Sequence, residues 1–108
     1  MADHLTPAVF HILLALATGD RHGYAIMKEA QRLSDGQIRL GAGTLYGTLQ
    51  RLIDLDWVAE SPRAGPKTLN GRYRRYYRIT TKGRSALNAD VERLQLLVKA
   101  ARVLREAK

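Results

Sequence analysis

Residues 41–55 combine side chains that suit close contact with an anionic partner. On a helix, one side of this segment would carry Thr44, Thr48 and Arg51, and no carboxylate occurs before Asp54. Ordinary exposed helices instead pair glutamate with lysine four residues apart. Hydroxyls and a guanidinium on a narrow helix fit the groove of a DNA duplex. The segment is therefore predicted to contact DNA, with a plain amphipathic core helix as the alternative.

The side chains of this helix divide by expected role, since phosphate contacts position a protein on DNA and base contacts specify sequence. Thr44 and Tyr46 lie near the helix start, where free N–H groups also attract anions, so both are expected to bind phosphate. Thr48 and Arg51 are expected to face outward and reach base edges. Gln50 is a further candidate at the border of that side, and a solvated surface arginine is the alternative for Arg51.

A second basic group lies in and just after residues 62–72, a segment with two prolines and two glycines. This composition predicts a hairpin loop. Lys67, Arg72 and Arg74 are expected to follow DNA phosphates or to enter the minor groove. Loop cations are often only solvated, so the cluster carries more weight than any one of its members.

Histidines raise the alternative of catalysis or metal binding. His4 and His11 are one heptad apart, Asp3 is beside them, and His22 stands at a predicted helix start. The chain has no HExxH, GxSxG or phosphate-loop motif, and its other carboxylates do not cluster with the histidines. It also has no cysteine, which removes thiolate zinc sites and disulfides. We therefore predict no catalytic residue, no metal and no cofactor.

Length and charge set the class of partner. A chain of 108 residues has room for one domain with a modest core, and its net charge of +8 favours a polyanion, nucleic acid before membrane. The longest apolar run, residues 12–17, is far shorter than the roughly 20 residues a membrane-spanning helix needs. No signal peptide is apparent, so a cytoplasmic protein without a membrane partner is expected.

The elements that would position these residues follow from periodicity and end signals. A first helix, apolar on nearly every side, is predicted between the Thr6–Pro7 start and Gly19–Asp20. A second begins near Gly23 and ends at the Asp35–Gly36 turn, and residues 37–40 alternate as in a very short strand. The DNA-contacting helix comes next, so the two helices form a helix-turn-helix.

A β-hairpin and a long last helix complete the prediction. Residues 57–61 and 73–79 are expected to pair as strands, which makes the fold a winged helix-turn-helix, mainly α with a small β-hairpin. The last helix is expected from about Lys82 to Ala107, capped by Thr80–Thr81. The predicted division is a DNA-binding domain over residues 1–80 and a dimerisation helix over residues 81–108.

The last helix is predicted to form a homodimer because nothing obvious remains in its own chain to cover it. Its apolar positions step by four, three, four and three residues, as in a coiled-coil seam. The alternative is that it folds back over the first helix within one subunit. The residues assigned to the dimer interface are Leu87, Val91, Leu94, Leu97, Val98 and Ala101.

Three blocks resemble the PadR family of bacterial transcriptional regulators. They are residues 22–26 (His-Gly-Tyr-Ala-Ile), residues 39–52 with Gly-Thr-Leu-Tyr at their centre, and residues 71–83 with Tyr-Tyr-Arg-Ile-Thr. The resemblance implies a dimeric winged helix, usually a repressor, whose C-terminal helix forms the dimer. The chain departs from the family where Gly41-Ala42 replaces Ser-Pro and Gly47 replaces Pro. We hypothesise that Gly47 lets the helix backbone approach DNA closely.

The predicted function is a dimeric, sequence-specific DNA-binding regulator, a repressor relieved by a small molecule or another signal. Two recognition helices about 34 Å apart would match a pseudo-palindromic operator. An effector could bind between subunits, although the same residues also fit a plain dimer core. The alternative is a winged-helix protein-interaction module without sequence-specific DNA binding. The residues assigned to the effector pocket are Phe10, Leu13, Leu14, Leu94, Leu97 and Val98.

Overall fold

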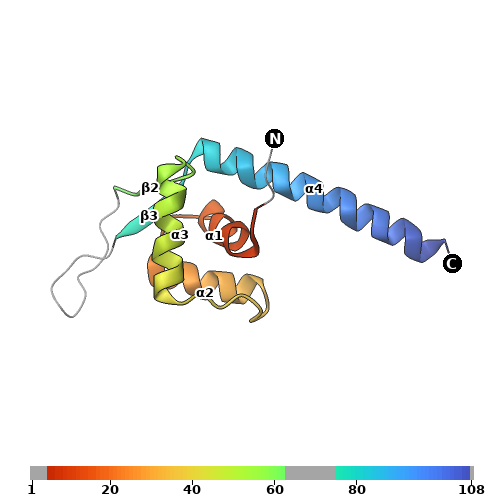
Figure 1. Cartoon of the computed structure of the whole chain (residues 1–108), viewed down its shortest axis with the longest axis horizontal. Helices are drawn as coiled ribbons and strands as arrows, with labels where there is room; N and C mark the ends of the chain where they lie inside the picture. The colour runs from red at the N-terminus through yellow and green to blue at the C-terminus, as the bar shows by residue number, and fades with distance from the viewer. Residues whose placement is uncertain (1–4, 63–74, 108) are drawn as a thin grey trace.

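The computed structural model describes residues 5–62 and 75–107, which form a small helical body with one projecting helix. Figure 1 shows the earlier helices gathered with a small sheet, while the last helix extends away from them toward the C-terminus. The elements are α1 (Pro7–Ala17), β1 (Arg21–His22), α2 (Gly23–Leu33), α3 (Ala42–Asp54), β2 (Val58–Glu60), β3 (Tyr76–Ile79) and α4 (Thr81–Glu106). The predicted fold class, mainly α with a winged helix-turn-helix and a long last helix, is confirmed.

Local capping fixes where the helices begin. The Thr6 hydroxyl accepts a hydrogen bond from the Val9 N–H at 3.2 Å, and Pro7 occupies the first turn of α1. The Thr80 hydroxyl accepts from the Gly83 N–H at 3.0 Å at the start of α4. Both helix starts could be predicted from the sequence, because a cap depends only on neighbouring residues.

The sheet has three antiparallel strands in the order β1-β3-β2, with Arg21 opposite Tyr77 and Val58 opposite Ile79. The prediction of a strand at residues 37–40 is wrong. That segment contains no strand, and the Ile38 N–H donates to the Ser34 hydroxyl at 2.8 Å, which holds the segment to the end of α2. Strand β1 was not predicted, because two residues are too few to show a period of two.

The core lies where α1 meets α2, α3, the sheet and the first turns of α4. Leu45, Leu49 and Leu52 of α3 are fully buried and recur as an apolar stripe at the spacing of one helix face, and Ile53 beside them is half-buried. Their buried neighbours include Ile12 and Leu16 of α1. Burial of this stripe fixes the rotation of α3 about its axis, and so decides which of its side chains face solvent.

Candidate nucleic-acid interface

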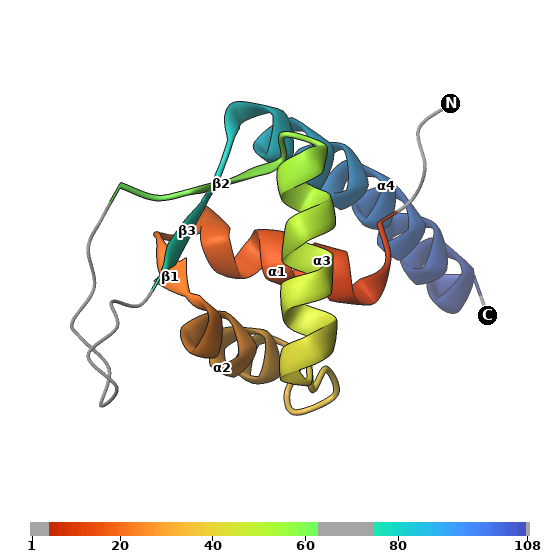
Figure 2. The ribbon, with the colours of Figure 1, turned by 60° about the vertical axis from the view of Figure 1, so that its left-hand side comes forward.

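The solvent side of α3 is the surface proposed above for DNA. Thr44, Tyr46, Gln50 and Arg51 are all exposed, and Figure 2 shows α3 crossing in front of α1 with one side open. Gly41 caps the helix without a side-chain hydrogen bond, so the first N–H groups of α3 stay available to an anion. The exposed side thus joins free backbone donors to hydroxyl, amide and guanidinium groups.

The structure corrects the placement of Thr48. This side chain is only 5% exposed, so it faces the core rather than a base edge. Thr48 lies three residues after Leu45, and residues three apart share a helix face. The buried stripe of α3 is therefore wider on that side than the leucines alone indicated.

Gln50 and Arg51 are both exposed, but among the residues that the structure describes only Gln50 of the two has a side-chain hydrogen bond to a carboxylate. The Gln50 side-chain amide donates to a carboxylate oxygen of Asp54 at 3.1 Å, so binding to a base would require it to leave this contact. Within the described ranges, no ion pair involves Arg51. Its guanidinium can therefore turn to a new partner without breaking an existing charge pair.

Tyr46 connects α3 to the start of α2. Its side chain is 50% exposed, and its hydroxyl end lies directly against Gly23, where the carbon of a Cβ would come within 2.8 Å of the Tyr46 Cζ. Burial raises the pKa of Tyr77, and the nearby Tyr46 phenol adds to this rise. The hydroxyl end of Tyr46 thus lies against α2, while half of the residue remains exposed to solvent.

The predicted wing contacts cannot be placed. Lys67, Arg72 and Arg74 lie outside the described residues. Strands β2 and β3 bracket that segment and pair with each other, with Glu60 opposite Tyr77. Tyr76 and Tyr77 are neighbours on β3 and both are buried; the ring of Tyr76 packs edge-on against His22 of β1, with 5.4 Å between the ring centres.

Helix α4 changes environment along its length. Leu87 is 4% exposed and belongs to the core of its own subunit, so its assignment to a dimer interface is wrong. Val91 is half-buried against the same core. Farther along, Leu97 is 55% exposed and Val98 is 49% exposed, so the described residues leave the second half of the predicted seam uncovered.

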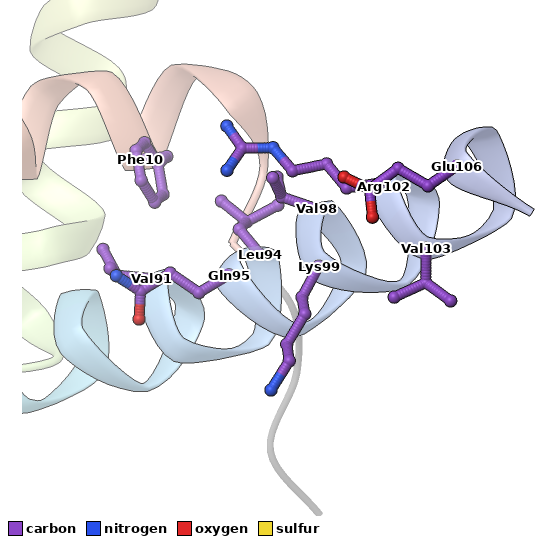
Figure 3. A pocket seen from close by; sticks show the side chains of 9 residues that line it. All are labelled: Phe10, Val91, Leu94, Gln95, Val98, Lys99, Arg102, Val103 and Glu106. Atoms are coloured by element: carbon purple, nitrogen blue, oxygen red, sulfur yellow. The ribbon is translucent and has the colours of Figure 1, made fainter.

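An open groove runs between α1 and α4, and Figure 3 shows Phe10 facing Leu94 and Val98 across it. Leu14 and Leu97 do not line this groove. Leu13 is fully buried in the core, so its assignment to a ligand pocket is wrong. The residues that line the groove are Phe10, Val91, Leu94, Gln95, Val98, Lys99, Arg102, Val103 and Glu106.

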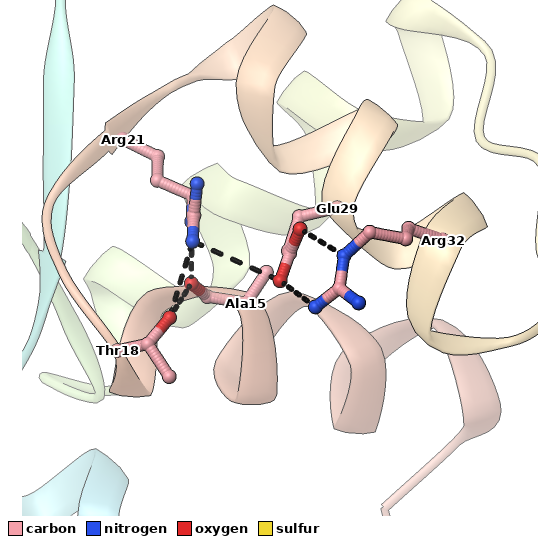
Figure 4. A network of polar contacts seen from close by, with 5 residues as sticks. All are labelled: Ala15, Thr18, Arg21, Glu29 and Arg32. Carbon is pink, nitrogen blue, oxygen red and sulfur yellow. Dashed lines mark hydrogen bonds and ion pairs between the residues drawn. The ribbon is translucent and has the colours of Figure 1, made fainter.

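A polar network fastens α2 to the end of α1 (Figure 4). The Arg32 guanidinium donates two hydrogen bonds to Glu29, at 2.9 and 2.7 Å. Arg21 lies 3.8 Å from the same carboxylate and donates from Nε to the Ala15 carbonyl at 2.8 Å. Because Arg21 belongs to β1, the network joins the end of α1 to both β1 and α2.

Replacing Glu29 with glutamine is expected to lower the free energy of unfolding by about 1 kcal/mol at pH 7. The hydrogen bond from Arg32 lowers the pKa of Glu29; burial opposes this, and attraction to Arg32 and Arg21 adds to it. A lowered pKa stabilises the folded state above the ordinary value of 4.5, and that stabilisation is lost as the pH falls.

Urea unfolding of the wild type and Glu29→Gln between pH 7 and about pH 3 measures this difference. The gap in free energy should shrink once the pH drops below 4.5. A gap that stays constant to the lowest pH would contradict the assignment.

Two exposed residues of α2 continue the surface around Tyr46. Tyr24 is 58% exposed, and the Lys28 ammonium lies 5.5 Å from the centre of its ring. No role was predicted for either, although their spacing of four residues places both on one side of a helix.

No group of three or more metal-ligating side chains gathers among the residues that the structure describes. None of the helices in these same ranges combines the length and the apolar composition that crossing a membrane requires.

The helix-turn-helix and the antiparallel sheet define the chain as a winged-helix protein with an added C-terminal helix. Residues 12–89 match the model of the transcriptional regulator PadR-like family. The chain belongs to this family, and it is a transcriptional regulator rather than an enzyme.

Individual relatives agree with this assignment. The chain is 38% identical over 89 residues to "Transcriptional regulator Rv3488" of Mycobacterium tuberculosis, covering 82% of this chain and 77% of that protein. A transcriptional regulator from Clostridium thermocellum superposes with a TM-score of 0.69 at 29% identity, covering 87% of this chain and 88% of that one. A PadR family regulator from Clostridium difficile shares the fold with a TM-score of 0.72 at 22% identity, covering 92% and 98%.

Proposed function

We propose that the protein is a homodimeric, sequence-specific DNA-binding repressor that acts in the cytoplasm. The observation that carries the proposal is the exposed side of α3 in a chain of charge +8. Thr44 and Tyr46 lie near a helix start that no side chain caps, and Arg51 lies in the last turn of the same helix. Thr44 and Tyr46 would bind phosphate, and Arg51 would read a base edge, with Gln50 beside it. In this proposal, Lys67, Arg72 and Arg74 add phosphate contacts from the wing.

The dimer would form through the second half of α4. Leu94, Leu97, Val98 and Ala101 share one side of that helix and are exposed. A second copy of the same surface would remove them from water. Residues 1–80 would then serve DNA binding and residues 81–108 dimerisation. This division is functional, because Leu87 packs in the core of the first part.

We propose the groove around Phe10, Leu94 and Val98 as the effector site that relieves repression. A small apolar molecule there would contact α1 and α4 together. If two copies of α4 join, the groove lies beside their interface. A ligand bound there could change the spacing of the two recognition helices.

The proposal is tested by selecting DNA with the purified protein at several salt concentrations and repeating the selection with Arg51→Ala. The wild type should select a pseudo-palindrome with an affinity that falls steeply with salt. Arg51→Ala should bind that site about tenfold or more weakly and lose preference at one position in each half-site. Uniform binding to all sequences, or no binding at low salt, would favour the protein-interaction alternative.

Replacing Gly47 with alanine separates folding from binding. No atom of the residues that the structure describes lies within 4 Å of where the new Cβ would be, so packing among them does not require glycine there. Alanine should stabilise α3 by about 1 kcal/mol. If the backbone approaches DNA at this point, the same methyl group should lower operator affinity severalfold.

Thermal unfolding and operator titration of Gly47→Ala measure the two effects side by side. A variant that is more stable and binds the operator as tightly as the wild type would refute the close approach.

A further inference from the structure

The first helix of the helix-turn-helix carries an exposed aromatic residue and a lysine held over it. Tyr24 leaves 58% of its surface in solvent, and Lys28 places its ammonium 5.5 Å from the Tyr24 ring centre. A cation over an aromatic face is attracted to it, which limits where the ammonium can go. The charge is therefore partly ordered before any partner arrives.

The carboxylate closest in sequence to Lys28 is already engaged. Glu29 is bound by Arg32 at 2.7 Å and faces Arg21 at 3.8 Å, and its side chain is only 14% exposed. Among the described residues, no ion pair involves Lys28. Its positive charge is available for an external anion.

The pair adjoins the proposed DNA-binding surface. The hydroxyl end of the Tyr46 side chain, which comes from α3, lies against the backbone of Gly23, the residue before Tyr24. Tyr46 and Tyr24 are both exposed, Tyr24 is the chain neighbour of the residue that Tyr46 contacts, and Lys28 lies one turn farther along α2. These residues extend the exposed polar groups from α3 to α2, and residues 23–28 contain no carboxylate.

We propose that Tyr24 and Lys28 bind a phosphate of the DNA strand that borders the groove entered by α3. In a helix-turn-helix the first helix crosses the DNA backbone while the second lies in the groove, so α2 would lie next to the phosphates. Lys28 supplies the charge, and the Tyr24 ring positions it while its hydroxyl donates to a phosphate oxygen. The inference rests on the proposed function, because it needs α3 in a DNA groove.

The test compares full-length wild type, Lys28→Ala, Lys28→Arg and Tyr24→Phe on the selected operator and on random duplex DNA between about 50 and 200 mM salt. Lys28→Ala should weaken binding about tenfold on both DNAs alike, and the salt slope should fall by about two per dimer. Lys28→Arg should retain most of the affinity, and Tyr24→Phe should lose part of it.

Lys82→Ala is the matched control. Lys82 is equally an exposed lysine on a helix, but it lies at the start of α4, beside the segment that follows the C-terminal end of α3. This variant removes the same charge and should leave the salt slope near that of the wild type. Circular dichroism of each variant checks that the fold is retained.

Failure of the α2 contact can be distinguished from failure of the proposed function. If Lys28→Ala binds with unchanged affinity and slope while Arg51→Ala loses the operator, the α2 contact is refuted and the proposed function stands. If the wild type binds no duplex DNA at low salt, the proposed function itself fails and the α2 contact falls with it. Equal losses in Lys28→Ala and Lys82→Ala would show a general charge effect and also overturn the inference.

Discussion

A glutamate in place of Leu97 is expected to turn the protein from a dimer into a monomer and to lower its affinity for a two-half-site operator at least about a hundredfold. Leu97 is 55% exposed on the side of α4 that also presents Leu94 and Val98. A carboxylate at the centre of an apolar contact would be buried without a partner, which is strongly unfavourable. Unlinked monomers must also bind the two half-sites independently, so they lose the raised effective concentration that a dimer gives its second subunit.

Leu96→Glu is the matched control for this prediction. Leu96 is even more exposed, at 70%, and precedes Leu97 by one residue, so it points to a different side of α4. The same charge there should leave the protein dimeric. Sedimentation or light scattering gives the oligomeric state, and operator titration gives the affinity. A Leu96→Glu monomer together with a Leu97→Glu dimer would put the interface on the wrong side of the helix.

The second large effect concerns Gly83, at the first turn of α4. A Cβ at this position would collide with the Trp57 carbonyl oxygen and come within 2.9 Å of the Ile79 Cγ1 atom. The carbonyl belongs to the backbone and accepts a hydrogen bond from the Thr80 N–H at 3.0 Å, so it cannot swing away. Gly83→Ala is therefore expected to lower the free energy of unfolding by about 2 kcal/mol, as other overpacked sites do.

Gly43→Ala makes the same chemical change where no atom lies within 4 Å, and it should leave stability equal or slightly higher. Denaturant unfolding of both variants beside the wild type gives the two differences. If Gly83→Ala unfolds at the same denaturant concentration as Gly43→Ala, the close approach between α4 and Trp57 does not limit the fold.

The features that could be predicted from the sequence depend on neighbouring residues. The starts at Thr6 and Thr80 follow from caps, and the leucine stripe of α3 follows from helical periodicity. The family could also be recognised, because its three blocks lie in order along the chain. Strand β1 could not be found, since Arg21 and His22 are a strand only through pairing with β3, far away in sequence.

The errors at the site have a shared physical origin. Periodicity gives the direction of a side chain around a helix, but not how far the neighbouring elements reach around it. Thr48 is therefore buried at the edge of the α3 stripe. In α4, one uninterrupted spacing serves two environments: Leu87 packs in its own subunit, while Leu97 remains exposed. The Tyr24–Lys28 pair could not be assigned to the site from the sequence, because its position beside α3 depends on the contact between Gly23 and Tyr46, which are far apart in the chain.

The central claim is that two identical subunits place their α3 helices in neighbouring turns of one duplex. The most direct test is to titrate the protein with its selected operator and with the same operator carrying five additional base pairs between the half-sites. Half a turn of DNA would move one half-site to the opposite face of the duplex. Affinity should then fall at least about a hundredfold. An affinity that ignores the insertion would contradict the account.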